Sequence, residues 1–201
     1  MKIPPSINRT TEGQYCLHCY STKVERAFKD GKTYYFCGDC QNTNERSLVI
    51  DNSINWWVDN ENNYWHESVG VVILNNKNEL LAIMRTIYPF AYSLPAGHLE
   101  KGEEPLTAAQ REVKEEVGIN IPKESFKLIQ EFQLPGDSCR RGGDHHLWHL
   151  YSAKTNHSAN AVKLNDEASG FRWFNLDEIT SSDDITYPLR YIVENLRNKF
   201  I

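Results

Sequence analysis

Two Cys-x-x-Cys pairs near the start of the chain place the tightest constraint on its fold. They are Cys16 with Cys19 and Cys37 with Cys40, and 17 residues separate them. Two tight turns that each supply two thiolates are typical of a tetrahedral zinc site with no open position, which is structural rather than catalytic. The alternative is a pair of disulfides. We favour zinc, because the N-terminal residues lack the apolar stretch of a secretion signal.

The segment between the two pairs predicts a β-hairpin. Asp30 and Gly31 form a strong turn signal, and strand-forming residues such as Val24 and Phe36 flank them. So short a segment has too few apolar residues to fold without a metal. Residues 1–50 therefore resemble a zinc ribbon.

The charge balance argues against nucleic acid as a partner. Residues 1–50 hold seven Lys/Arg and five Asp/Glu, and four thiolates on Zn²⁺ add about two negative charges, so the ribbon is close to neutral. The whole chain carries a net charge of −5. No apolar run approaches the roughly 18–20 residues of a membrane span. We expect a cytoplasmic protein that binds no membrane.

Residues 51–66 form an expected connector that is rich in Asn and Asp but also aromatic. It contains Trp56, Trp57, Tyr64 and Trp65. We expect these rings to bury the seam between two modules, with base stacking as the alternative.

From Glu67 the pattern changes to strand, Asn-rich turn and strand, followed by a Gly/Pro loop and a helix. The helix is expected to open at Glu103–Pro105 and to end at Gly118. Its apolar residues recur at three- and four-residue steps, as one buried stripe requires. They are Leu106, Ala109, Val113 and Val117.

Three carboxylates of this helix, Glu112, Glu115 and Glu116, lie at spacings that share one face. Like charges so placed cost roughly 0.2–0.5 kcal/mol per pair. A solvated surface tolerates that cost, whereas a bound Mg²⁺, which prefers oxygen ligands, removes it.

The segment from Gly97 to Ile119 resembles the Nudix box, G-x5-E-x7-R-E-U-x-E-E-x-G-U with U aliphatic. Every defined position is filled, which makes the match highly specific. These positions are Gly97, Glu103, Arg111, Glu112, Val113, Glu115, Glu116, Gly118 and Ile119.

The resemblance implies a mixed-sheet α/β/α sandwich over residues 67–201 and hydrolysis of a phosphoanhydride bond that depends on Mg²⁺ or Mn²⁺. Glu112, Glu115 and Glu116 look like the metal ligands, with the carbonyl of Gly97 as a further one. The resemblance also pairs Arg111 with Glu103, so that Arg111 steers Glu112. A purely structural Arg–Glu pair carries equal weight.

Three residues outside the box are further candidates. Many Nudix enzymes use an additional acid as base or ligand, and Glu167 resembles it, with a plain loop acid as an even alternative. Arg140 and Arg141 are candidates to bind a terminal phosphate, because guanidinium groups pair bidentately with phosphate. The alternative, at least equally well supported, is that the loop containing Arg140 and Arg141 is a solvated hairpin tip.

The substrate is expected to be a small nucleotide, a nucleoside diphosphate linked to another group. A ribbon before a Nudix module resembles NADH pyrophosphatases, but their S-Q-P-W-P-F-P-x-S signature is absent here. ADP-ribose pyrophosphatases often have an L-P-A-G entry to the box and a proline sixteen residues after it. This chain has both, as Leu94-Pro95-Ala96-Gly97 and Pro135, so the resemblance favours ADP-ribose or a related nucleotide sugar.

Three alternatives stay open. They are an NADH or NAD pyrophosphatase, an enzyme acting on nucleotide-capped RNA, and a non-catalytic Nudix sensor whose ribbon binds nucleic acid. The intact box favours an enzyme. Nudix hydrolases of this type are often homodimers, so the resemblance also allows a homodimer.

The other potentially reactive side chains, a cysteine and three histidines, are expected to have structural roles. Cys139 has no visible partner and is expected to be a free thiol. His145, His146 and His149 fit strand positions better than a metal site, with His145 and His149 on one face. The last fourteen residues predict an amphipathic helix that packs on the sheet.

Overall fold

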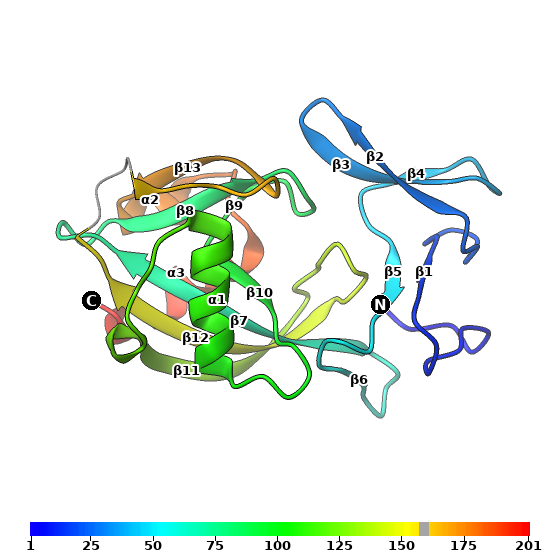
Figure 1. The fold of residues 1–201 in the computed structure, drawn as a ribbon, viewed down its shortest axis with the longest axis horizontal. Helices are drawn as coiled ribbons and strands as arrows, with labels where there is room; N and C mark the ends of the chain where they lie inside the picture. Colours follow the sequence, from blue (N-terminus) through cyan, green and yellow to red (C-terminus); the bar gives the residue numbers. More distant parts are fainter. Residues whose placement is uncertain (157–160) are drawn as a thin grey trace.

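A mixed eight-stranded sheet forms the centre of the molecule in the computed structural model, which describes residues 1–156 and 161–201 (Figure 1). Five strands follow one another across it: β11 (Lys127–Pro135), β12 (His145–Lys154), β7 (Tyr64–Leu74), β8 (Leu80–Arg85) and β13 (Ala168–Phe174). β6 (Trp56–Val58) and β10 (Ala96–His98) pair with β7, and β9 (Tyr92–Ser93) pairs with β8. β12 runs parallel to β7, and the other pairs are antiparallel.

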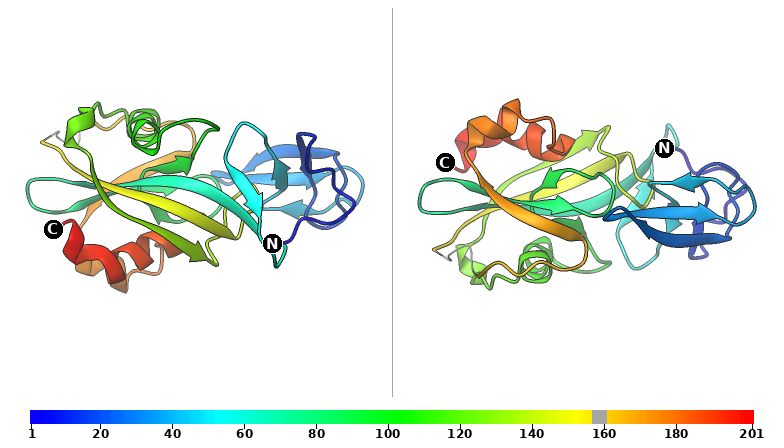
Figure 2. Two further views of the ribbon diagram at one scale, coloured as in Figure 1. Left: turned by 90° about the horizontal axis from the view of Figure 1, so that it is seen from below. Right: turned by 90° about the horizontal axis from the view of Figure 1, so that it is seen from above.

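Helices cover both faces of this sheet, as Figure 2 shows. α1 (Pro105–Val117) lies on one face, and α2 (Leu176–Ser181) and α3 (Tyr187–Leu196) lie on the other. Short 3₁₀ turns stand at Lys123–Ser125 and Arg197–Lys199. The predicted α/β/α sandwich is confirmed.

Strand alternation explains the two apolar layers. Val71 and Ile73 of β7 face α1, whereas Val72 and Leu74 face α3, and all four are fully buried. The C-terminal helix buries its predicted stripe. Those residues are Leu189, Ile192, Val193, Leu196 and Phe200.

The N-terminal residues form two small sheets. One contains β2 (Val24–Lys29), β3 (Lys32–Cys37) and β4 (Thr43–Asn44), and the other pairs β1 (Gly13–Tyr15) with β5 (Leu48–Ile50). The predicted hairpin is present. Asp30 (φ 50°) and Gly31 (φ 74°) turn the chain in the left-handed region, as a tight hairpin turn requires.

The aromatic segment 51–66 supplies part of the large sheet, because β6 lies within it and β7 begins at Tyr64. Tyr64 is fully buried, and its hydroxyl donates to the carbonyl of Val49 at 2.7 Å. Trp57 stacks on Trp65 with ring centroids 5.8 Å apart.

The N-terminal part is docked on the loop between β11 and β12 through backbone hydrogen bonds. The amides of Ser47 and Val49 donate to the carbonyls of Arg140 and Arg141, each at 3.0 Å. Arg46 adds side-chain bonds to the carbonyls of Cys139 (2.8 Å) and Gly143 (2.9 Å). The described residues contain no helix with the length and apolar character needed to cross a membrane.

Candidate active site

Helix α1 carries the carboxylates of the box. Pro105 occupies its first turn, and Gly118 ends it at φ 68° while its amide donates to the carbonyl of Lys114. The face toward the sheet buries Glu112 (8% exposed) and Glu116 (5% exposed) together with the apolar stripe. Two acids are therefore held at the edge of the core, where charge is costly.

Glu116 is the more constrained of the two. Its Oε2 accepts a hydrogen bond from the amide of Ala96 at 2.8 Å. Burial, together with the nearby charge of Glu112, raises the pKa of Glu116 to about 8.

Glu112 lies directly against the loop before the helix. A Cβ placed on Gly97 would come within 1.9 Å of Oε1 of Glu112, so the close approach of loop and helix requires glycine at this position. Burial raises the pKa of Glu112 in spite of the neighbouring Arg111.

Arg111 and Glu103 form the predicted pair. The guanidinium binds Glu103 bidentately at 3.0 and 2.9 Å, and it also reaches Oε1 of Glu112 at 2.7 Å. Its bond to Glu103 lowers the pKa of that carboxyl. Glu115 lies 3.3 Å from Arg111 with a side chain that is 55% exposed, so it sits at the rim.

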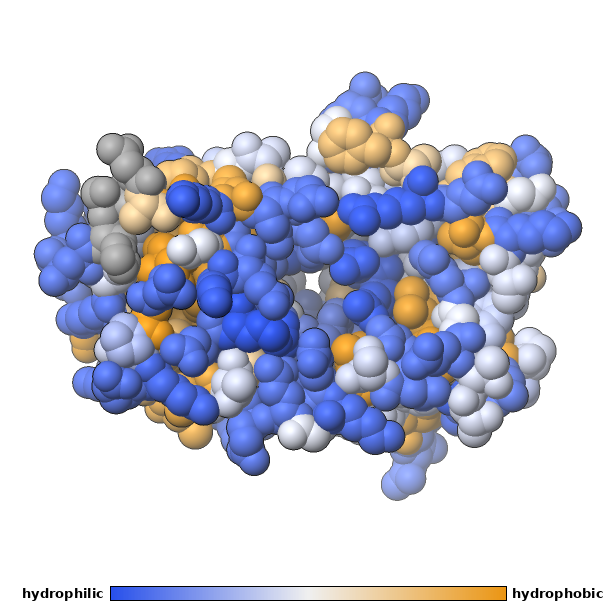
Figure 3. Space-filling view, viewed as in Figure 1, coloured by the Kyte–Doolittle hydropathy of each residue, from blue (hydrophilic) through white to orange (hydrophobic). Residues whose placement is uncertain are grey.

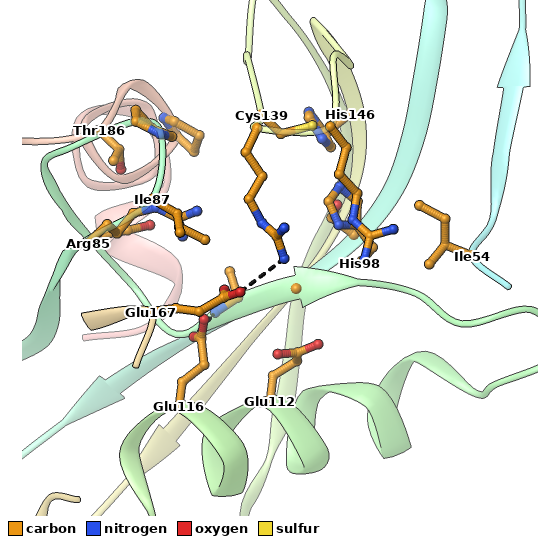
Figure 4. Close-up of a pocket in the computed structure, with 18 of the residues that line it drawn as sticks. Ile54, Arg85, Ile87, His98, Glu112, Glu116, Cys139, His146, Glu167 and Thr186 are labelled. Carbon is orange, nitrogen blue, oxygen red and sulfur yellow. Dashed lines mark hydrogen bonds and ion pairs between the residues drawn. The ribbon is translucent and has the colours of Figure 1, made fainter. Parts of the chain in front are cut away.

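Glu167 and Arg140 line the same pocket, and Figure 4 shows Glu167 close to Glu116. Arg140 donates to Oε1 of Glu167 at 2.9 Å. Arg141 also lines the pocket, but it forms an ion pair with Asp51 of the segment before β6. The arrangement thus separates the two arginines that the sequence grouped together.

Most of these groups line one cavity of about 460 Å³: Arg111, Glu112, Glu115, Glu116, Arg140, Arg141 and Glu167. In the space-filling view of Figure 3, hydrophilic residues surround a hollow between the two parts of the molecule. Two further arginines line the cavity, and the sequence did not single them out. Arg85, at the end of β8, has a buried Nε without a hydrogen-bond partner among the described residues, and Arg26 comes from β2 of the ribbon. Its position as a basic residue at the end of a predicted strand could have identified Arg85 as a candidate site residue.

The four N-terminal cysteines come together as predicted. The Sγ atoms of Cys16 and Cys40 are 3.7 Å apart, and those of Cys19 and Cys37 are 3.6 Å apart. Four thiolates around Zn²⁺ at about 2.3 Å would be separated by about 3.8 Å. None of the four is in a disulfide.

Cys139 is a free thiol, as predicted, but it has close neighbours that the sequence did not reveal. Its Sγ lies 3.4 Å from Nδ1 of His66 on β7, and His98 and His146 complete a compact cluster with it. The expectation that His146 belongs only to a strand was therefore too narrow. His149 instead lies between Glu67 (2.6 Å) and Glu131 (2.9 Å).

Comparison with known proteins identifies the family of the larger domain. The model of the NUDIX domain matches residues 64–196. The chain is 31% identical over 128 residues to an RNA pyrophosphohydrolase of Rickettsia bellii, covering 58% of this chain and 79% of that protein. It is 46% identical over 66 residues to the 8-oxo-dGDP phosphatase NUDT18 of Danio rerio, covering 31% of this chain but only 20% of that protein.

A solved structure supports the fold. The MutT protein of Methanosarcina mazei Go1 superposes with a TM-score of 0.56 at 20% identity, covering 67% of this chain and 94% of that one. The family match spans well over half of the chain and contains every box residue described above. The chain therefore belongs to the Nudix hydrolase family.

Proposed function

We propose that the protein is a pyrophosphohydrolase that depends on Mg²⁺ or Mn²⁺ and cuts the phosphoanhydride bond of a nucleoside diphosphate derivative. One observation carries this proposal. The buried carboxylates Glu112 and Glu116 line a single cavity together with Glu167 and Arg140, and this cavity is large enough for a nucleotide.

The donor set fits a hard divalent cation. Carboxylate oxygens are the ligands that Mg²⁺ prefers, and a cation would offset the mutual repulsion of Glu112 and Glu116. Glu115 and the carbonyl of Gly97 are the further proposed ligands. When bound, the metal would polarise phosphate oxygens and lower the pKa of a bound water.

The chain itself holds and orients these groups. Arg111, fixed by its two bonds to Glu103, restrains Oε1 of Glu112. Arg140 and Arg85 supply positive charge for a diphosphate in the same cavity. Glu167, which we propose as a base or further metal ligand, is held by its ion pair with Arg140.

For the substrate, we propose ADP-ribose or a related nucleotide sugar. The supporting residues are the Leu94–Gly97 entry to the box and Pro135, which ends β11. The relative from Rickettsia bellii is named an RNA pyrophosphohydrolase, so RNA with a 5′-triphosphate belongs in the same assay.

The four-cysteine cluster is proposed to hold structural Zn²⁺. The sulfur separations fit a tetrahedral ion, and four protein ligands leave no open position for substrate.

Product analysis tests the activity. The protein is incubated with Mg²⁺ and, separately, ADP-ribose, NADH, a nucleotide sugar, diadenosine polyphosphate, nucleoside triphosphates and 5′-triphosphate RNA. We expect AMP from ADP-ribose at the highest rate. Cleavage of none of them by folded, Mg²⁺-binding protein would overturn the proposed activity, and a better substrate would replace only the substrate assignment.

Glu116→Gln tests the site. We expect kcat to fall by at least about 100-fold, because loss of a direct metal ligand should exceed the 10–100-fold effect of losing a residue that supports one. Glu104→Gln is the control, since Glu104 precedes the same helix, is exposed and makes no capping bond. Equal activity of the two variants would contradict the metal role of Glu116.

A further inference from the structure

A second cluster of metal-ligating side chains lies apart from the box carboxylates, and three of its four members line the same cavity. It consists of His66, His98, Cys139 and His146, and their four ligand atoms all lie within 4.8 Å of one another. These side chains come from β7, β10, the β11–β12 loop and the start of β12. Figure 4 shows Cys139 and His146 on the side of the pocket away from Glu112 and Glu116.

Polar atoms of this cluster lack hydrogen-bond partners. His66 is 0% exposed, and its Nε2 has no partner among the described residues. The Nε2 of His98 is buried and unpartnered as well. Burying a polar group without a partner costs about 1–3 kcal/mol, so the unpartnered Nε2 of His98 calls for a ligand. The nitrogen of His66 that faces Cys139 is Nδ1.

The loop backbone is shaped to the cluster. A Cβ on Gly143 would lie 2.8 Å from Nδ1 of His66, so glycine lets the loop pack against that ring. Arg46 binds the carbonyls of Cys139 and Gly143 and thereby restrains the loop from the other side.

His146 is oriented as metal-bound histidines usually are. Its Nδ1 lies 3.0 Å from the carbonyl oxygen and 3.1 Å from the carboxylate of Asp137, and both are acceptors, so Nδ1 carries the proton. The lone pair of Nε2 is therefore left for a ligand. Asp137 is itself buried and accepts from Nε1 of Trp148 at 2.8 Å. A carboxylate–histidine pair of this kind commonly supports a bound metal.

We propose that His66, His98, Cys139 and His146 bind a second Zn²⁺, with one sulfur and three nitrogen ligands. A tetrahedral ion at about 2.1–2.3 Å from each ligand separates neighbouring ligand atoms by about 3.4–3.7 Å. The 3.4 Å between Sγ of Cys139 and Nδ1 of His66 fits this geometry. A thiolate with imidazoles suits zinc and does not suit Mg²⁺.

With four protein ligands this ion is structural. It fastens the β11–β12 loop to the central strand β7 and to β10, which contains Gly97 of the box. Arg140, next to Cys139, is thereby held at the catalytic cavity.

The first experiment uses the intact wild-type protein, produced with added zinc and washed with a weak chelator. Elemental analysis should give about two zinc ions per chain, and zinc-edge X-ray absorption should give an average near 2.5 sulfur and 1.5 nitrogen ligands per zinc. One zinc per chain with four sulfur ligands would overturn the proposal.

Two variants locate the ions. Cys139→Ser should retain about one zinc with four sulfur ligands, and Cys16→Ser should retain about one zinc with one sulfur and three nitrogens. His145→Gln is the matched control, because His145 adjoins His146 but lies outside the cluster, and it should keep both ions. If Cys139→Ser does not fold, wild type and Cys16→Ser still decide the question. Two zinc ions in folded Cys139→Ser would refute the second site.

Discussion

Residues 1–50, the proposed zinc ribbon, and the Nudix sheet within residues 64–196 differ in their apolar packing. The sheet is packed between two apolar layers that α1 and α3 cover. The ribbon has one small apolar cluster, and that cluster is completed by Tyr64 of β7. Phe28 of the ribbon hairpin is 70% exposed.

The difference is the reason to propose that a four-cysteine metal site stabilises the N-terminal region, whereas apolar packing stabilises the sheet. Apolar burial contributes roughly 25 cal/mol per Å², which suffices for a sheet packed on both faces. A hairpin with exposed faces has little such area, so we expect it to depend on the proposed Zn²⁺ and on its contacts with the larger domain.

The largest expected effect comes from Cys37→Ser, which removes a buried thiolate of the ribbon. Zinc contributes about 10–16 kcal/mol to the folding of isolated zinc-finger peptides, so residues 13–44 should lose nearly all amide protection. Hydrogen exchange with mass spectrometry measures this, and β7 and β12 should stay protected. Ser6→Ala is an exposed control, and unchanged ribbon protection in Cys37→Ser would break the comparison.

Leu81→Ala should destabilise the sheet by about 2–5 kcal/mol, because Leu81 is fully buried on the α1 side of β8. Its zinc content should remain that of wild type. Urea unfolding and elemental analysis check both statements. Leu128→Ala, at a side chain that is 53% exposed, serves as the control with a small effect. Loss of zinc from folded Leu81→Ala would show that the two regions are not separately stabilised.

Arg46→Ala should weaken the junction by about 1–3 kcal/mol, since it removes the hydrogen bonds of the guanidinium to the carbonyls of Cys139 and Gly143 and its ion pair with Asp144. Amide exchange should rise in the β11–β12 loop and in β5, and the centre of the sheet should not change. Arg9→Ala is the control within the ribbon. If exchange rises equally throughout the sheet, the junction is part of the core.

The smallest effect concerns the ion pair between Asp51 and Arg141. Burial raises the pKa of Asp51, but bonds from Ser53 and Arg141 outweigh it and lower the pKa to about 2. The pair therefore stabilises fully above the unfolded value of about 3.9 and is lost only as pH falls toward 2.

A double-mutant cycle with Asp51→Asn and Arg141→Gln should give a coupling below about 1 kcal/mol that is constant from pH 6 to pH 8. Urea unfolding of the four proteins measures it. A coupling that varies across that range would show that another titrating group controls the junction.

Local features of the fold were predictable from sequence. The hairpin at Asp30–Gly31, helix α1 with its stop at Gly118, and the buried stripe of α3 each depend on residues a few positions apart. The shared face of Glu112 and Glu116 was also predictable, because they are four residues apart on one helix.

The rest depends on contacts between distant segments. His66 lies 73 residues before Cys139 in the chain, and only the pairing of β7 with β12 and β10 brings them together. Arg26 reaches the cavity because the ribbon docks on the loop that contains Arg140. The spacing of residues along the sequence does not reveal contacts between such distant segments.

The docking of the ribbon on the β11–β12 loop also has a consequence for synthesis. Arg46 is 93 residues before its partner Cys139, and β7 pairs with a parallel strand that begins 80 residues after Trp65. Contacts so far apart in sequence form late, because a long loop must close before they add stability. During synthesis, the contacts that dock the first fifty residues on the β11–β12 loop therefore cannot form until the second half of the chain has left the ribosome.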